Sequence, residues 1–249
     1  MDALILCGGF ATRLEPITLF MPKHLLPIGG KPLLEYILQD LSNLNVDRIV
    51  IATNKRFEDQ FLYWINNRNV NNKQKLELIV EPAINNQVKL GAIKGMKYAI
   101  EKANLNNDLL VIAGDNYYDF SLNDVVKKFY SKNAPVICLY NIKSEDDAKR
   151  FGVVKINDDL ITNFVEKPSA PESTLISTGI YIFSKKELSL IDRYLSDNNN
   201  PDSPGYLVQW LIKNTQIYGV VCEGNWVDIG TIDSYKKIFF EKYEGKPLI

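Results

Sequence analysis

Two glycines and two cations near the start of this 249-residue chain are the residues best suited to phosphate chemistry. Gly8 and Gly9 follow an apolar run at residues 3–7, and Arg13 and Lys23 come shortly afterwards. A glycine pair lets backbone N–H groups approach a phosphate with no Cβ in the way. Arg13 can donate to two phosphate oxygens at once, whereas Lys23 supplies a compact, mobile charge. A Gly-Gly pair alone is more often an ordinary tight turn, but the added cations favour a phosphate-binding loop.

The elements that must position this loop alternate between strand and helix over the first 140 residues. Short apolar runs predict strands at 3–7, 48–52, 76–80, 109–113 and 134–140. Helical spacing predicts helices from Pro32 to Leu41, at 57–65, at 89–101, and from a capping-box-like sequence at 121–124. This alternation predicts an α/β fold with a Rossmann-like mixed, mainly parallel sheet flanked by helices. The glycine loop would then lie at the carboxyl end of a strand, where open α/β sheets bind ligands.

The pattern changes after residue 150. Strand-like runs at 153–156, 161–165 and 175–183 follow one another with little helix between them, which predicts an antiparallel lobe on one edge of the sheet. Helices are expected at 186–194 and 205–213, a strand at 217–221, and finally an amphipathic helix carrying Ile232, Tyr235, Ile238 and Phe239. No linker or internal repeat is evident, so we expect one domain over residues 1–249, with the lobe at 150–225.

Bulk composition excludes several functional classes. The chain has 29 basic and 30 acidic residues, and its net charge of −1 provides no basic surface for nucleic acid. No apolar stretch approaches the ~20 residues needed to span a bilayer, so we expect no membrane association. Three scattered cysteines and an amino terminus without a cationic leader predict a reduced, cytoplasmic setting. The sequence leaves open whether the chain forms a homo-oligomer.

The amino-terminal segment as a whole resembles the signature of the sugar-1-phosphate nucleotidyltransferases. The matching parts stand in order as Gly8-Gly9, Thr12-Arg13-Leu14, Pro22-Lys23, Leu25-Leu26-Pro27 and Lys31-Pro32. The resemblance implies a GT-A-like nucleotidyltransferase fold, with nucleotide contacts from Gly8, Gly9 and Thr12 and catalytic roles for Arg13 and Lys23. Ala11 stands where the family usually has a second loop glycine, and an alanine there should be tolerated if its φ is negative.

Similar motifs continue through the chain. Ala113-Gly114-Asp115-Asn116 and Trp226-Val227-Asp228-Ile229-Gly230-Thr231 resemble the family's two metal-binding elements, which implies a Mg²⁺ cofactor held by Asp115 and Asp228. Phe151-Gly152 and Glu166-Lys167-Pro168 resemble sugar-side elements and imply a catalytic contact from Lys167 to the sugar phosphate. The implied sugar contacts are Asn116, Gly152, Glu166, Ser177 and Tyr181. Taken singly, either aspartate could be a turn residue and Glu166-Lys167 an exposed charge pair.

The segment that would read the base matches the family least well. Glu81-Pro82 and Leu90-Gly91-Ala92 are the counterparts of its base-reading motifs, so Glu81 and Gly91 are expected to contact the nucleotide. An ionised Glu81 only accepts hydrogen bonds, whereas a glutamine would both accept and donate. Gln87 is a second candidate for this role.

Together these residues predict an enzyme that joins a nucleoside triphosphate to a sugar 1-phosphate and releases pyrophosphate. The resemblance favours dTTP or UTP with glucose 1-phosphate, and the alternative is a CTP- or GTP-dependent member acting on another sugar 1-phosphate. A related metal-dependent glycosyltransferase is disfavoured because the fourth strand carries no Asp-x-Asp motif. A non-catalytic regulatory homologue is disfavoured because Arg13, Lys23, Asp115, Lys167 and Asp228 are all present.

Overall fold

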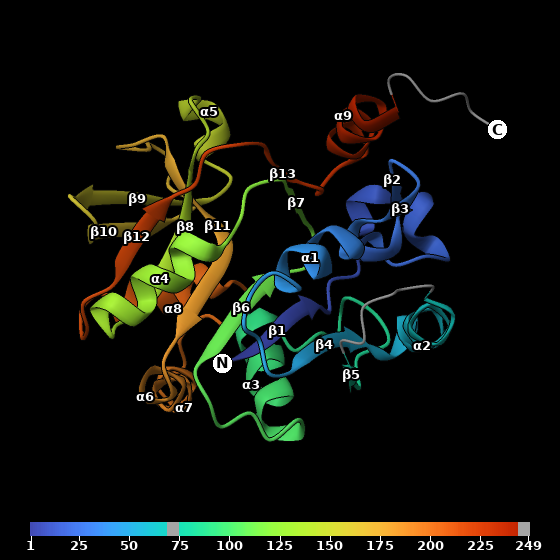
Figure 1. Cartoon of the computed structure of the whole chain (residues 1–249), viewed down its shortest axis with the longest axis horizontal. Helices are drawn as coiled ribbons and strands as arrows, with labels where there is room; N and C mark the ends of the chain where they lie inside the picture. Colours follow the sequence, from blue (N-terminus) through green and yellow to red (C-terminus); the bar gives the residue numbers. More distant parts are fainter. Residues whose placement is uncertain (69–74, 244–249) are drawn as a thin grey trace.

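One nine-stranded sheet runs through the computed structural model, which describes residues 1–68 and 75–243 (Figure 1). The strand order is β5-β4-β1-β6-β11-β8-β12-β10-β9. The strands are β1 Asp2–Cys7, β4 Ile49–Asn54, β5 Leu76–Glu81, β6 Leu109–Ala113, β8 Val136–Asn141, β9 Gly152–Asn157, β10 Leu160–Glu166, β11 Leu175–Phe183 and β12 Tyr218–Val221. Strands β5, β4, β1 and β6 are parallel neighbours, as the alternation of elements predicted.

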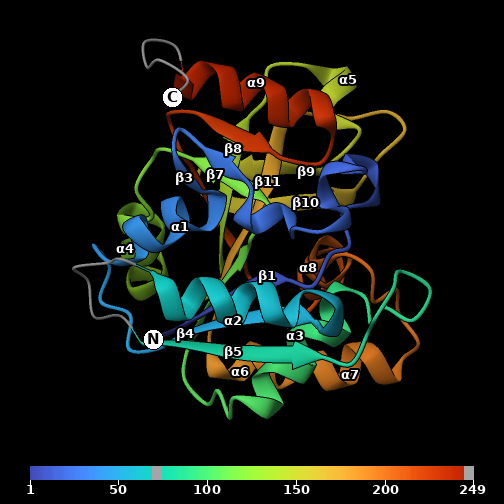
Figure 2. The same ribbon diagram turned by 90° about the vertical axis from the view of Figure 1, so that its right-hand side faces the viewer.

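The parallel strands separate two hydrophobic cores, one on each face of the sheet. In β1, Ala3, Ile5 and Cys7 enter one core and Leu4 enters the other, because successive side chains of a strand point to opposite faces. Helices α1 (Leu33–Leu41), α2 (Glu58–Asn67) and α4 (Asn123–Lys132) pack on the first core. Helices α3 (Ala92–Lys102), α7 (Leu190–Ser196) and α8 (Pro204–Leu211) pack on the second (Figure 2). The expected helices on both faces are therefore confirmed.

The antiparallel region is not confined to one edge, so that part of the prediction is wrong. Strand β11 lies inside the sheet between β6 and β8 and is antiparallel to both. Only β10 and β9 extend the sheet beyond β12. Strand β11 is largely apolar and is buried over nearly its whole length. An interior position in the sheet covers both of its faces. The lobe at 150–225 is thus continuous with the parallel half.

Several helix boundaries also differ from the prediction. The capping box expected at 121–124 does not form, because the Ser121 hydroxyl accepts from the Asn123 backbone N–H in a local turn. Pro32 ends the short hairpin of β2 (Pro27–Ile28) and β3 (Lys31–Pro32), and α1 begins one residue later. The helix expected at 186–194 is two short helices, α6 (Lys185–Leu188) and α7, with the smaller α5 (Glu145–Ala148) elsewhere. Residues 244–249 of the expected domain lie outside the described residues.

A two-stranded ribbon outside the main sheet joins distant parts of the chain. Strand β7 (Asn116–Tyr118) pairs antiparallel with β13 (Trp226–Asp228), and Asn116 is directly opposite Asp228. A third core fixes the ribbon, since Tyr117 and Ile229 pack there with Leu14 and with Ile238 of α9 (Ile232–Tyr243). The ribbon brings a carboxyl-terminal aspartate to the end of β6. No described helix combines the length and apolarity that crossing a membrane requires.

Ala11 adopts the left-handed conformation with a φ of 51°, so the condition of a negative φ is not met. Two hydrogen bonds to its carbonyl oxygen hold it there. The Thr18 hydroxyl and the Leu14 backbone N–H each donate at 2.9 Å. For a residue with a Cβ this conformation costs about 1–2 kcal/mol.

We therefore predict that Ala11→Gly increases the free energy of unfolding. The relief of backbone strain exceeds the extra entropy that glycine gives the unfolded chain, for a net gain of about 0.5–1 kcal/mol. Urea denaturation of both proteins measures the difference. Ala170→Gly, in an exposed loop without positive φ, is the control and should be neutral or destabilising. A less stable Ala11→Gly protein would contradict the strain argument.

Candidate functional site

A cleft crosses the carboxyl ends of β1, β5 and β6 and has two halves that share Ala113, Asp115 and Pro204. Residues lining the first half include four expected nucleotide contacts, Gly8, Gly9, Glu81 and Gly91, together with Lys23. The second half is lined by all the expected sugar contacts, Asn116, Gly152, Glu166, Ser177 and Tyr181, together with Arg13, Lys167 and Asp228. Thr12 is exposed and lines neither half. Asp115 stands where the halves meet.

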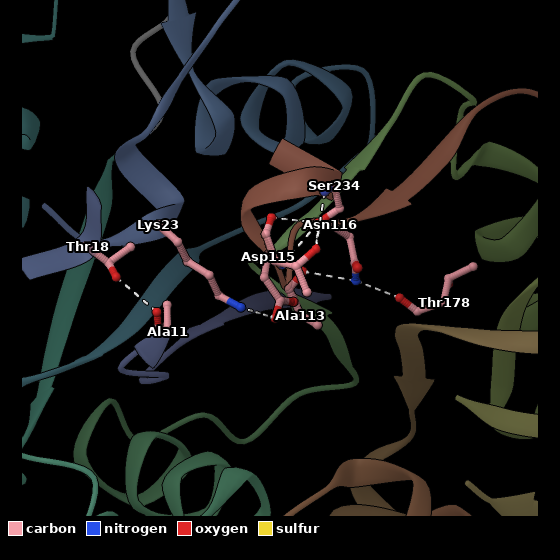
Figure 3. Close-up of polar contacts among 9 residues, drawn as sticks. Ala11, Thr18, Lys23, Ala113, Asp115, Asn116, Thr178 and Ser234 are labelled. Carbon is pink, nitrogen blue, oxygen red and sulfur yellow. Dashed lines mark hydrogen bonds and ion pairs between the residues drawn. The ribbon is translucent and has the colours of Figure 1, made fainter. Parts of the chain in front are cut away.

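A buried ion pair joins the glycine-loop segment to the end of β6. The Lys23 ammonium donates to Asp115 Oδ2 at 2.5 Å, and Lys23 is only 8% exposed (Figure 3). Burial by itself would raise the pKa of Asp115, but the adjacent ammonium outweighs it and holds that pKa below its usual value. The pair places one fixed positive and one fixed negative charge at the junction of the two halves.

Asp228 reaches the same junction through the β7–β13 ribbon. The Ile229 backbone N–H donates to the Asp115 carbonyl at 3.0 Å, which fastens the two aspartate-bearing segments together. Burial, and then the negative charge of Asp115, raise the pKa of Asp228 to about 6. The two carboxylates are thus close enough to repel each other.

This pair of carboxylates fits a divalent metal ion. Carboxylate oxygens are preferred ligands of Mg²⁺, which commonly takes one or two of them and completes its shell with substrate phosphates and water. Among the described residues, no group of three or more His, Cys, Asp or Glu could hold a metal without other ligands. The raised pKa of Asp228 marks an uncompensated charge that a cation would neutralise. Asp115 and Asp228 would therefore hold Mg²⁺ jointly with a bound phosphate.

Four cations surround the junction, and sequence reasoning identified three of them. Arg13 is exposed, and its guanidinium approaches Gly230 beside Asp228, where a Cβ would lie 3.4 Å from Nη2. Lys167 is also exposed and faces the second half. Arg150, in the same lining, was missed, although its place just before the Phe151-Gly152 motif could have indicated it.

The second half contains a carboxylate held in a narrow slot. The Glu166 side chain is 5% exposed, and the Ser203 hydroxyl donates to its Oε1 at 2.8 Å. A Cβ at Gly205 would lie 1.8 Å from Oε2, and one at Gly152 would lie 3.0 Å from it. Burial raises the pKa of Glu166 against the opposing effects of Ser203 and Lys167. Sequence reasoning found Glu166 and Gly152 but missed Ser203.

Strand β11 forms the floor of the second half and is irregular there. Its pairing with β8 shifts between Ser177 and Tyr181, and Gly179 has a φ of 80°. The Asn116 side-chain amide crosses to donate to the Thr178 carbonyl at 2.6 Å (Figure 3). The Ser177 hydroxyl donates to the Tyr181 oxygen at 3.1 Å. These buried polar groups give the floor donors and acceptors suited to a hydroxylated ligand.

In the first half, Glu81 is buried without a counter-charge. Gly8 and Gly95 leave space for its carboxyl group, since a Cβ at either position would lie within 2.9 Å of Oε1. Within the described ranges 1–68 and 75–243 no side chain or backbone group hydrogen-bonds that carboxyl group. Burial raises its pKa to about 7. Gln87 is exposed and does not line the cleft, so Glu81 is the better placed of the two candidates.

His24 lines the first half but is unsuited to act as a base. It is 1% exposed, and burial, followed by the charge of Lys23, lowers its pKa to about 3.

Comparison with known proteins gives a consistent result. A family model described as nucleotidyl transferase matches residues 2–244. A Sulfolobus acidocaldarius protein provisionally named mannose-1-phosphate guanyltransferase is 31% identical over 97% of this chain and 63% of its own length. The bifunctional protein GlmU of Methanococcus aeolicus is 32% identical over 92% of this chain and 51% of its own length. The chain thus spans about half to two thirds of these relatives.

A solved structure resembles the whole chain. It is a provisionally named glucose-1-phosphate thymidylyltransferase from Bacillus anthracis in complex with a sucrose. The TM-score is 0.84 at 25% identity, over 97% of this chain and 95% of the other. The similarity supports the mixed α/β architecture described above.

Replacing Asp228 tests the charge balance at the junction. Its folded pKa of about 6 lies above the ordinary aspartate value of 3.8, so its stabilising contribution is present below pH 3.8 and is lost as pH rises through 6. We predict that Asp228→Asn raises the free energy of unfolding by about 2–3 kcal/mol at pH 7.5 and leaves it nearly unchanged at pH 4. Denaturant titrations at both pH values measure this.

The matched control is Asp197→Asn, an exposed aspartate outside the cleft, which should be neutral at both pH values. Equal stability of Asp228→Asn and the wild type at pH 7.5 would show that the Asp228 carboxylate is already neutralised.

Proposed function

The chain belongs to the nucleotidyl transferase family, and from this membership we propose that it transfers a nucleotidyl group from a nucleoside triphosphate to a sugar 1-phosphate. The observation that carries the proposal is the continuous cleft, in which the Lys23–Asp115 pair separates a glycine-lined half from a hydroxyl-lined half. The first half suits a nucleotide and the second a sugar phosphate.

The reaction requires two anions to approach each other. An oxygen of the sugar 1-phosphate attacks the α-phosphorus in line, a new P–O bond forms, and the bond to the bridging oxygen of the β-phosphate breaks. Pyrophosphate leaves with that oxygen. The attacking phosphate is already ionised near neutral pH, so no protein base is needed. The chain therefore contributes positioning and charge neutralisation.

Each cation has a distinct share in this neutralisation. Lys23, buried and paired with Asp115, would stabilise charge at the α-phosphoryl group. Arg13, exposed beside Asp228, would bind the departing pyrophosphate through two donors. Lys167 would bind the attacking sugar phosphate from the second half. Mg²⁺, held by Asp115 and Asp228 when bound, would supply Lewis-acid stabilisation of the phosphate oxygens.

For the substrates we propose dTTP or UTP with glucose 1-phosphate. The B. anthracis structure is named a thymidylyltransferase, whereas the S. acidocaldarius relative is named a guanyltransferase. The names of these two proteins therefore differ in the nucleobase. The state of Glu81 favours thymine or uracil over cytosine. With its pKa near 7 the neutral acid is well populated, and it both donates and accepts, as a glutamine would. Thymine and uracil offer the complementary N3–H donor and carbonyl acceptor, whereas the N3 of cytosine only accepts.

The first test is a pyrophosphate-release screen of the common triphosphates against several sugar 1-phosphates with Mg²⁺. We predict that Lys167→Ala lowers turnover about 10²–10³-fold with little change in the melting temperature, because its side chain is 56% exposed and its ion pair with Glu166 is long, at 3.8 Å. Lys127→Ala, an exposed lysine outside the cleft, is the control and should retain full turnover. No pyrophosphate release by the wild type with any substrate pair would exclude the proposed function.

Glu81 gives a pH-dependent prediction. Because the neutral acid binds the pyrimidine edge and is lost as pH rises through about 7, the KM for dTTP or UTP should rise about tenfold between pH 6 and 8. Glu81→Gln, which always donates and accepts, should remove that rise, and it also controls for titration of the triphosphate itself. A wild-type preference for GTP that strengthens with pH would contradict the pyrimidine assignment, since guanine offers two donors to a carboxylate.

A further inference from the structure

Two of the three cysteines meet inside the main sheet. Cys138 lies in β8, and Cys222 directly follows β12, which is the parallel neighbour of β8 (Figure 1). Val220 is opposite Cys138 in the register, so Cys222 lies two residues further along on the same face of the sheet. The two sulfur atoms are 3.1 Å apart, although 84 residues separate these cysteines in sequence. The fold thus creates a thiol pair that sequence spacing does not indicate.

The pair has no part in the candidate site. Neither Cys138 nor Cys222 lines the cleft. Among residues 1–68 and 75–243, no third His, Cys, Asp or Glu completes a metal site with them. The remaining cysteine, Cys7, lies in β1, and two strands, β6 and β11, separate β1 from β8. At about 4.8 Å per strand, Cys7 is roughly 14 Å away and cannot join the pair.

The two thiols differ in their access to solvent. Cys222 is 9% exposed and lies between the exposed residues Val221 and Glu223, whereas Cys138 is fully buried. Burial, and then the hydrogen bond with Cys222, raise the pKa of Cys138 well above its usual value. A reagent that arrives from solvent therefore meets Cys222 first, and Cys138 is the neighbour that can react next.

We propose that Cys138 and Cys222 form a reversible intramolecular disulfide by exchange with a low-molecular-weight disulfide, and that this bond stabilises the fold. The inference is independent of the proposed function. First, Cys222 loses its proton to solvent and its thiolate attacks the small disulfide, whose S–S bond breaks and releases one thiolate. Cys138 then loses its proton and attacks the Cys222 sulfur, which releases the second thiolate. Two protein thiols are oxidised by two electrons, and one small disulfide is reduced to two thiols.

The backbone already holds the two residues in place for this bond. The Cys222 N–H donates to the carbonyl of Leu139, the residue after Cys138, at 2.8 Å. A disulfide needs its sulfur atoms about 2.05 Å apart, so about 1 Å remains to be closed. Cys222 lies beyond the last residue of β12, and a small movement there leaves the four register pairs of β12 and β8 intact.

The bond would close a long loop. Strands β9, β10 and β11 all lie between the two cysteines in sequence. A crosslink across a loop of this length lowers the conformational entropy of the unfolded chain, while the folded chain keeps its contacts. The oxidised protein should therefore melt about 5–10 °C above the reduced protein.

The experiment is incubation of the full chain with excess oxidised glutathione, with reduced glutathione as the reference. Free thiols are then alkylated, and peptides are mapped by mass spectrometry without reduction. We expect one linked peptide pair that joins Cys138 to Cys222. The number of titratable thiols in denaturant should fall from three to one, and the melting temperature should rise. Dithiothreitol should reverse both changes.

Two variants test the assignment. Cys222→Ser removes the accessible thiol, so its two remaining thiols should stay free and its melting temperature should not rise on oxidation. Cys7→Ala, which removes the cysteine outside the pair, is the matched control. Its oxidised form should contain the bond and should melt above its own reduced form by the same interval as in the wild type.

Each alternative result contradicts a stated part of the inference. Three free thiols after incubation, a lasting mixed disulfide of glutathione on Cys222, or a Cys222 bond between two chains would overturn the proposed pairing. A Cys138–Cys222 bond without a higher melting temperature would overturn its stabilising role. None of these results bears on pyrophosphate release, so the proposed function is tested separately.

Discussion

In the proposed reaction, electrostatic repulsion between two phosphate-bearing substrates is the constraint on which the arrangement of the cleft depends. At the junction of the two halves of the cleft, Lys23 and Asp115 are paired without any bound ligand. Lys23 is buried and Asp115 is half-buried, so the loss of either partner would leave a poorly hydrated charge. Such a pair keeps its geometry, so charge stabilisation requires little reorganisation during the reaction. Parallel pairing of β1 and β6 is what delivers the two segments to one edge.

The second carboxylate depends on a different part of the fold. Asp228 comes from near the carboxyl terminus and reaches Asp115 only because β13 pairs with β7. The third core, in which Leu14 packs with Tyr117 and Ile229, stabilises the pairing of β7 with β13. The same few apolar contacts thus hold the loop that carries Arg13, the Asp115 segment and the Asp228 segment in one relative position. Burial, and then the proximity of Asp115, raise the pKa of Asp228, and a cation bound there would oppose both effects.

Much of the fold and of the candidate site could be predicted from the sequence, because uniformly apolar runs and helical spacing are local signals. The parallel strands, the helices on both faces and most of the expected cleft residues follow from such signals and from motif resemblance. Thr12 lies outside the cleft, and the lining residues Arg150 and Ser203 were missed. The pairing of strands that are far apart in the chain produces no local pattern in the sequence. The interior place of β11 and the β7–β13 ribbon are set by which buried surfaces fit together, and neither is encoded in one segment. The φ of Ala11 depends on hydrogen bonds from Thr18 and Leu14, and the neutral form of Glu81 depends on the burial that Gly8 and Gly95 permit.

The interior position of β11 limits how this architecture can diversify. One strand serves as the floor of the proposed sugar subsite and as the hydrogen-bonding partner of β6, which ends two residues before Asp115. Residues 150–225 therefore do not form a separately exchangeable unit. Recombination that replaced them with those of a relative would also replace the strand that pairs with β6. If the proposed function holds, new sugar preferences would have to arise by point substitutions at positions such as Ser177 and Tyr181, on a backbone that the parallel half of the sheet already constrains.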